Sequence, residues 1–109
     1  MPITTGSGSY TVDLPGVFDS YFSGSSIAQG QTNDLSDREA HTAYRSLVRI
    51  KRGRGSILRI TGSRRALLVI REYAHNFIEE VVIDREFEHS SSELRAMRSV
   101  VERIDAVLK

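Results

Sequence analysis

The chain has 109 residues and a formal net charge of +1, with 39% hydrophobic residues and no cysteine. This length suits one domain with its own core, and the lack of cysteine excludes disulfides, thiolate metal sites and a cysteine nucleophile. The start of the chain has no secretory signal pattern, and no apolar run approaches the roughly 20 residues of a membrane span. We therefore expect a cytoplasmic protein that does not contact membranes.

The first 34 residues differ in composition from the rest. Glycine and serine dominate residues 6–9 and 23–26, which is typical of flexible chain. Between them, residues 10–14 form a strand candidate that ends before Pro15, and an apolar group follows that would dock onto a core. That group consists of Val17, Phe18, Tyr21 and Phe22. We expect residues 1–34 to be an N-terminal tail or docking segment, either ordered or partly disordered, and residues 35–109 to be a single compact domain.

The first predicted helix covers residues 36–52. Ser36 and Glu39 match a capping box at its start, and Gly53 suits a left-handed cap at its end. Helical spacing puts Ala40, Ala43, Leu47 and Ile50 on one face. The opposite face carries Arg38, Arg45, Arg49 and Arg52. The pattern predicts a strongly amphipathic helix with an arginine face.

Four further elements follow. Residues 57–61 are β-branched and bounded by glycine, so they are predicted as a strand. Ser63 can cap a helix over residues 64–79, although residues 66–70 could instead form the second arm of a hairpin around Gly62. Residues 81–87 are a weaker strand candidate. Residues 91–108 follow a capping box of Ser90 and Glu93 and form the last predicted helix.

An apolar seam marks the last helix. Its members repeat at 3–4–3–4 spacing, which is typical of a helix face that packs in a core or an oligomer interface. They are Leu94, Met97, Val101, Ile104 and Leu108. Together these elements predict a mixed α/β (α+β) fold dominated by three helices, with one or two short strands. The alternative is a three-helix bundle, and the seam leaves a homodimer or larger homo-oligomer open.

Charge is segregated along the chain. Residues 40–71 contain nine arginines and lysines and no acid, whereas residues 72–93 contain seven acids and only Arg85 as a base. The predicted binding residues are the cations of the first stretch, together with Arg38. They are Arg38, Arg45, Arg49, Lys51, Arg52, Arg54, Arg64 and Arg65. A bare cationic surface repels itself unless something answers its charge.

Three partners could answer that charge: nucleic-acid phosphates, an acidic surface of another protein, or the chain's own acidic stretch 72–93, within one copy or between two. We interpret the chain as a non-enzymatic binding protein that uses an arginine-rich surface over residues 38–71. Nucleic-acid binding or regulation is its most concrete function. The alternative is a protein–protein interaction or assembly module, acting as a homo-oligomer, an adaptor or an inhibitor.

No catalytic residue, metal ligand or cofactor is predicted. The chain has no phosphate-binding loop, dinucleotide fingerprint, nucleophile elbow or zinc-protease motif. Glu72 and His75, like Glu86 and His89, match the spacing of di-iron carboxylate helices, with Glu79 as an added oxygen ligand. A metal-carboxylate enzyme therefore remains a remote alternative to a solvated helix face.

Overall fold

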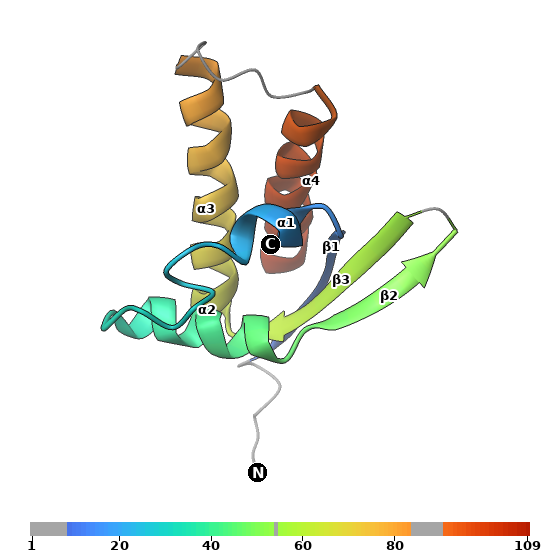
Figure 1. Cartoon of the computed structure of the whole chain (residues 1–109). Helices are drawn as coiled ribbons and strands as arrows, with labels where there is room; N and C mark the ends of the chain where they lie inside the picture. The colour runs from blue at the N-terminus through green and yellow to red at the C-terminus, as the bar shows by residue number, and fades with distance from the viewer. Residues whose placement is uncertain (1–8, 54, 84–90) are drawn as a thin grey trace.

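The computed structural model describes residues 9–53, 55–83 and 91–109, and it is a helix-rich α+β fold (Figure 1). In chain order its elements are β1 (Tyr10–Pro15), α1 (Phe18–Phe22), α2 (Leu35–Arg45), β2 (Val48–Arg52), β3 (Gly55–Gly62), α3 (Arg64–Ile83) and α4 (Ser91–Leu108). α3 and α4 stand side by side, α2 crosses below α3, and the hairpin of β2 and β3 projects away from the helices.

The three strands form one antiparallel sheet in the order β1-β3-β2. Gly53 lies in the tight turn between β2 and β3 with a φ of 58°, a left-handed conformation that glycine adopts without steric cost. The register places Val12 opposite Ile60 in the first pair of strands and Ile50 opposite Ile57 in the second. β3 is therefore the central strand, and β1 and β2 are the two edges.

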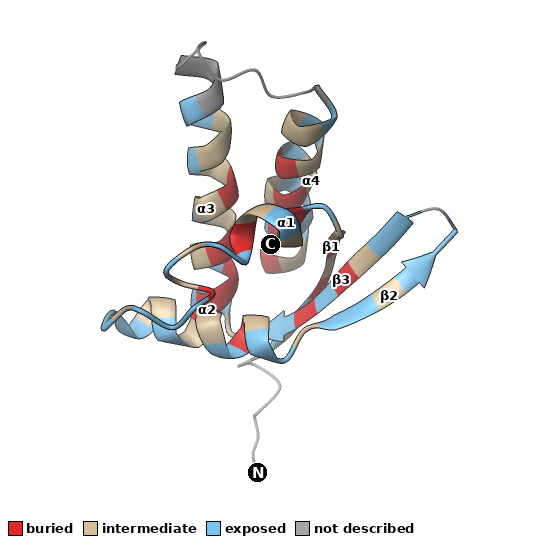
Figure 2. Cartoon of the chain, viewed as in Figure 1, coloured by how far each residue is buried: buried red, intermediate tan, exposed pale blue. Residues whose placement is uncertain are grey.

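The core lies between one face of the sheet and the helices (Figure 2). Alternate residues of β1 and β3 enter it, as the two-residue period of a strand requires. The fully buried large side chains are Leu14, Phe18, Phe22, Leu58, Ile60, Leu67, Ile70, Met97, Val100 and Ile104. Each side chain of this size stabilises the fold by about 1.5–3 kcal/mol through burial alone.

The predicted N-terminal strand is present as β1, and the apolar group after it forms the short helix α1. Phe18 and Phe22 are buried in the same core as α3 and α4, and their rings stack with centroids 5.1 Å apart. Gly16, between β1 and α1, donates its backbone N–H to the carbonyl of Ser56 over 2.9 Å. A Cβ on Gly16 would lie 1.9 Å from the Ser56 Oγ, so this close approach requires glycine.

The prediction of one helix over residues 36–52 is wrong. α2 ends at Arg45, and residues 48–52 form β2. The helix begins after Asp34, whose carboxylate accepts hydrogen bonds from the N–H groups of Ser36 and Asp37, rather than at a box of Ser36 and Glu39. The physical reason is that β3 pairs with all five residues of this segment across the Gly53 turn, and this pairing outweighs the helical periodicity of the segment.

The remaining predictions divide as follows. The helix over 64–79 is confirmed as α3, with the Ser63 Oγ accepting from the Ala66 N–H over 3.0 Å, and it continues to Ile83. The strand over 57–61 is confirmed and extended as β3. A hairpin does exist, but it pairs residues 55–59 of β3 with residues 48–52, and residues 66–70 belong to α3. The strand over 81–87 is wrong at 81–83, which belong to α3, and residues 84–87 lie outside the described residues.

The helix over 91–108 is confirmed as α4, although its Ser90 cap lies outside the described residues. Met97, Ile104 and Leu108 of the seam are buried in the core, and Leu94 and Val101 are half-buried. Val100 was not part of the predicted seam, yet it is fully buried. The buried face of α4 is therefore rotated slightly from the one that the spacing indicated, because α4 packs against both α3 and β1.

A basic strand at the open edge of the sheet

The predicted binding residues lie on three different elements. Arg38 and Arg45 are on the exposed side of α2, while Arg49, Lys51 and Arg52 belong to β2. Arg64 and Arg65 begin α3. Arg54 lies outside the described residues. The structure therefore does not join these residues into one helical arginine face, because the predicted helix is divided into α2 and β2.

Several of these cations already have a partner in the chain. Arg49 bonds Asp19 of α1, with Nη2 and Oδ2 2.9 Å apart. Arg65 lies 3.7 Å from a carboxylate oxygen of Glu39, a loose pair. Arg64 donates to the carbonyl oxygen of Leu108 over 2.8 Å, at the C-terminal end of α4 where a cation is favoured by the helix dipole.

Among the described residues, the acids that pair with the basic stretch 40–71 lie outside the acidic stretch 72–93. Arg59 pairs with Asp13 of β1 and Arg71 with Asp105 of α4, in addition to the pair of Arg49 with Asp19. In the part of the chain that the structure describes, no cation of residues 38–71 forms an ion pair with residues 72–83 or 91–93. The basic stretch is thus partly neutralised within the copy, by carboxylates outside the acidic stretch.

Five of the predicted cations have no ion-pair partner among residues 9–53, 55–83 and 91–109. They are Arg38, Arg45, Lys51, Arg52 and Arg64. All five are exposed, and Arg64 is the one that donates to the backbone carbonyl of Leu108. Lys51 and Arg52 lie next to each other at the end of β2. We call the whole of this strand, Val48–Arg52, the basic edge.

A polar cluster holds the basic edge against the rest of the protein. Asp19 of α1 accepts hydrogen bonds from the Tyr44 hydroxyl and from Arg49. Burial raises the pKa of the Asp19 carboxyl, but the hydrogen bonds from Tyr44 and Arg49 outweigh it and lower that pKa below its usual value. Burial and the same carboxylate raise the pKa of Tyr44 to about 12. The Tyr44 ring also packs on Phe22, with centroids 5.0 Å apart.

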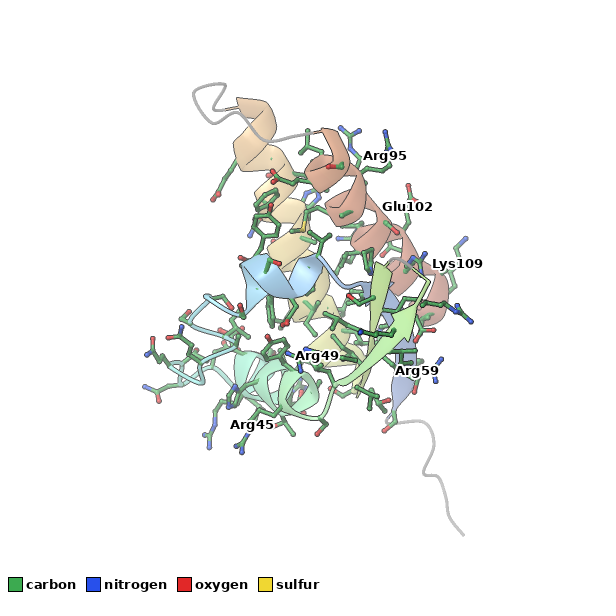
Figure 3. The ribbon with its side chains drawn as sticks, turned by 45° about the vertical axis from the view of Figure 1, so that its right-hand side comes forward. Arg45, Arg49, Arg59, Arg95, Glu102 and Lys109 are labelled. Carbon is green, nitrogen blue, oxygen red and sulfur yellow. The ribbon has the colours of Figure 1, made fainter. Side chains whose placement is uncertain are left out.

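This cluster joins three elements, because Asp19 belongs to α1, Tyr44 to the end of α2 and Arg49 to β2. Arg49 points back toward the body of the protein, whereas Arg45 points away from it (Figure 3). Arg49 therefore positions the hairpin through its ion pair with Asp19, although its side chain is 62% exposed. The cations of the basic edge without an ion-pair partner among the described residues are Lys51 and Arg52.

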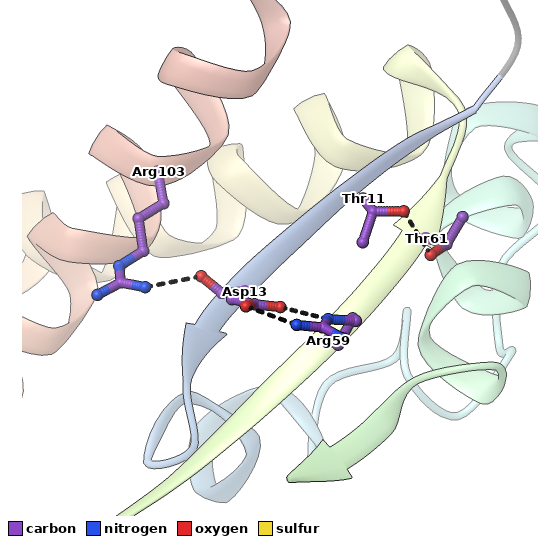
Figure 4. A network of polar contacts seen from close by, with 5 residues as sticks. All are labelled: Thr11, Asp13, Arg59, Thr61 and Arg103. Atoms are coloured by element: carbon purple, nitrogen blue, oxygen red, sulfur yellow. Dashed lines mark hydrogen bonds and ion pairs between the residues drawn. The ribbon is translucent and has the colours of Figure 1, made fainter. Parts of the chain in front are cut away.

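The other edge of the sheet is covered. α4 packs along β1, and the Arg103 guanidinium donates to the backbone carbonyl of Asp13 over 3.1 Å (Figure 4). The Asp13 carboxylate accepts two hydrogen bonds from Arg59 of β3, at 2.8 and 3.2 Å. The hydrogen bond from Arg59 lowers the pKa of the Asp13 carboxyl. The Thr11 and Thr61 hydroxyls bond across the same two strands over 2.9 Å.

β2, by contrast, has no strand of the described residues on its outer side. Half of the backbone N–H and C=O groups of an edge strand point away from its neighbour, toward solvent. Its side chains mix charge with apolar surface: Val48 is 55% exposed and Ile50 is half-buried. Val48, Ile50 and Arg52 share the face of the sheet opposite the core, while Arg49 and Lys51 share the face of Leu58 and Ser56.

An open hollow adjoins Lys51 on that second face. It is lined by Pro15, Gly16, Val17, Lys51, Gly53, Gly55 and Ser56, so it lies between the start of α1 and the tip of the hairpin. Val17 is 42% exposed beside it. Among its described lining residues, the hollow offers Lys51 as a cation beside the apolar Pro15 and Val17, so it can accept an acidic side chain, and those residues include no pair of groups for acid–base catalysis.

The described residues of the metal-carboxylate alternative lie on the exposed surface of α3. His75 lies 3.0 Å from Glu79 on the surface of α3, and both side chains are exposed in large part. Within the described residues, no three histidine, aspartate or glutamate side chains gather as a metal site requires. Glu86 and His89 lie outside the described residues. No helix of the described part is long and apolar enough to cross a membrane.

Sequence reasoning missed the residues that make the edge distinctive. The helical pattern places Ile50 on the apolar face of a helix and gives Val48 no role. Asp19 lies in the N-terminal docking segment, where the sequence predicts no charged contact for it. One signal was present: residues 48–52 alternate apolar and basic side chains up to Val48-Arg49-Ile50-Lys51, directly before a glycine turn. Nothing in the sequence indicated Asp19, which is 30 residues from Arg49.

Comparisons of the chain with protein-family models, curated proteins and solved structures found no match.

Proposed function

We propose that the chain is a non-enzymatic binding protein whose basic edge binds an acidic segment of a partner protein. One observation carries this proposal. β2 is an open edge that bears two cations without an ion-pair partner among the described residues, Lys51 and Arg52, beside the half-exposed Val48. A surface that combines cations without an ion-pair partner among the described residues, apolar side chains and backbone groups that point away from β3 suits a polypeptide ligand.

The distribution of charge supports a protein partner over a nucleic acid. Affinity for nucleic acid comes largely from cations that neutralise phosphates. Arg49, Arg64 and Arg65 are engaged by Asp19, the carbonyl of Leu108 and Glu39, respectively, so they are less available for phosphates. The Tyr44 ring packs on Phe22 and its hydroxyl donates to Asp19, so this aromatic side chain beside the basic edge is engaged within the protein and less available to stack on a base.

Nucleic-acid binding is the second candidate, and it has an observation of its own. Arg38 and Arg45 are seven residues apart and therefore share one exposed side of α2, the helix that leads into β2. With rises of about 1.5 Å per helical residue and about 3.3 Å per strand residue, the unpaired cations extend over roughly 30 Å of chain path. An extended polyanion could follow such a line.

The test separates the two candidates by titration at low and moderate salt. The probes are polyglutamate, a short single-stranded RNA, a short single-stranded DNA and a DNA duplex, each labelled with a fluorophore. We expect the polypeptide to bind and the Lys51→Glu/Arg52→Glu variant to bind at least about tenfold more weakly, because two attractive charges become repulsive. Binding of the oligonucleotides alone, with a steep salt dependence, would establish the second candidate instead.

A matched control keeps the net charge change constant. Arg95 and Arg98 of α4 are exposed and have no ion-pair partner among the described residues, and α4 is not adjacent to β2 in the sheet. The Arg95→Glu/Arg98→Glu variant therefore makes the same change elsewhere. Equal loss of polyglutamate binding in both double variants would show that only the overall charge matters, which contradicts a site at the basic edge.

A further inference from the structure

We infer that the acidic partner segment binds as a fourth strand, hydrogen-bonded to the open edge of β2. This inference rests on the proposed function and adds to it the conformation of the ligand and the pattern of its side chains. The geometry that carries it is the sheet order β1-β3-β2, with α4 covering the edge of β1 and no described element paired to the outer side of β2.

The backbone of β2 already has the extended conformation that strand addition requires. All five of its residues pair with β3 in continuous register, from Val48 opposite Arg59 to Arg52 opposite Gly55. Because the hairpin is fixed to α1 through Arg49 and Asp19, its strand is already extended before any ligand arrives. Main-chain hydrogen bonds to a preformed edge supply affinity, and the alternating side chains then supply specificity.

One face of the added strand would meet positive charge. Lys51 lies on the same face as Arg49 and lines the hollow beside Val17. A directly opposed side chain on a neighbouring strand lies within about 5.5 Å at Cβ, near enough for an ion pair. Since Asp19 already neutralises Arg49, an acidic side chain opposite Lys51 gains the most from this face.

The other face of the added strand would meet apolar surface. Val48 and Ile50 share it, and Ile57 of β3 lies directly opposite Ile50. A β-branched side chain on the ligand would pack on Val48 and Ile50, while an acid near the hairpin tip would meet Arg52. The ligand that fits therefore alternates acidic and β-branched residues opposite Val48–Lys51, and a further acid opposite Arg52 adds to this pattern at the hairpin tip.

A second copy of the chain fits this edge poorly. Pairing β2 with β2 of another copy would bring Arg49, Lys51 and Arg52 of both strands together, and like charges opposite one another destabilise a sheet. Lysine on an edge strand is a common means of preventing such self-pairing. The charges that exclude a copy are the same ones that attract an acidic strand.

The experiment uses the full chain labelled with ¹⁵N and two seven-residue peptides of equal composition. One alternates glutamate with valine, and the other places the glutamates and valines in separate blocks. Affinity is measured by fluorescence anisotropy, and amide hydrogen exchange is followed by NMR. We expect the alternating peptide to bind at least about tenfold more tightly than the block peptide, and alternate amides of Val48–Arg52 to exchange at least about tenfold more slowly in the complex.

The outcomes separate this inference from the proposed function. Binding of both peptides with equal affinity and unchanged amide exchange in β2 would overturn strand addition while the acidic ligand stands. Failure of both peptides and of polyglutamate to bind would overturn both proposals. The Lys51→Ser/Arg52→Ser variant then tests a different role for the cations, which is to prevent β2 strands of two copies from pairing. Self-association of that variant, together with no peptide binding by the wild type, would show that the cations have only this role.

Discussion

The two edges of the sheet are built in opposite ways. At β1, α4 lies along the strand, Arg103 bonds an outward backbone carbonyl, and the nearby carboxylate of Asp13 is satisfied by Arg59. At β2, the described structure places no element beyond the strand, and Lys51 and Arg52 have no ion-pair partner there. Because both strands pair with the same central strand, the difference arises from what covers them and not from the sheet itself.

That contrast separates the roles of the arginines. At the covered edge, Arg59 and Arg103 donate hydrogen bonds to the carboxylate and the backbone carbonyl of Asp13. On the open side, Arg49 fixes the hairpin to Asp19, while its neighbours in sequence remain available. A count of arginines over residues 38–71 therefore overstates the free charge of the surface.

The largest expected effect tests whether the two edge strands differ in burial. Leu14 of β1 is fully buried, so Leu14→Ala should lower the free energy of unfolding by about 2–5 kcal/mol through lost burial and a cavity. Val48→Ala, on the exposed face of β2, should lower it by less than about 1 kcal/mol. Urea unfolding measures both. Similar losses in the two variants would contradict the open edge.

The next effect concerns the cluster that fixes β2. Asp19→Asn removes the negative charge that accepts from Tyr44 and Arg49, and should lower the free energy of unfolding by about 1–2 kcal/mol. Glu102→Gln is the matched control, because Glu102 is exposed on α4 without a polar partner among the described residues. An Asp19 variant as stable as the control would show that the hairpin is held by packing alone.

A related prediction follows from acid titration. The pKa values of Asp13, Asp19 and Asp105 are all lowered from 3.8 in the folded protein. A carboxyl with a lowered pKa stabilises the fold fully above its unfolded-state pKa, and this contribution is lost as pH falls through the folded-state pKa. Stability should therefore decline below about pH 4.

Thermal unfolding of the wild type and the Asp19→Asn variant between pH 7 and pH 2 provides the measurement. The variant should lose less stability over the acid range, because one of the three linked carboxyls is gone. Parallel curves for the two proteins would mean that Asp19 titrates alike in the folded and unfolded chain, against the direction assigned to its pKa.

The smallest effect is on local opening. Amides of the central strand β3 should exchange most slowly, those of β1 at an intermediate rate and those of β2 fastest, because within the described part of the chain α4 packs along β1 whereas β2 has only β3 beside it. Hydrogen exchange followed by NMR in the free protein resolves this order. Equal protection of β1 and β2 would remove the comparison on which the proposed edge depends.

Local signals were sufficient where the neighbouring residues dominate. The Ser63 cap and the apolar repeats of α3 and α4 were predictable because helical hydrogen bonds close within four residues. Prediction failed at residues 46–52 because the apolar and arginine spacing of residues 38–45 continues through them in a helical pattern. Only pairing with β3 makes residues 48–52 a strand, and that pairing depends on residues 55–59 as well as on the segment itself.

The same division applies to the candidate site. Composition determined that residues 40–71 are basic and free of acids, and it favoured binding over catalysis. Which cations remain free was decided by the fold, because Asp13, Asp19 and Asp105 reach Arg59, Arg49 and Arg71 from positions 30 to 46 residues away. Charge is a property of each residue, whereas neutralisation requires two charges to meet, and only tertiary structure brings distant residues together.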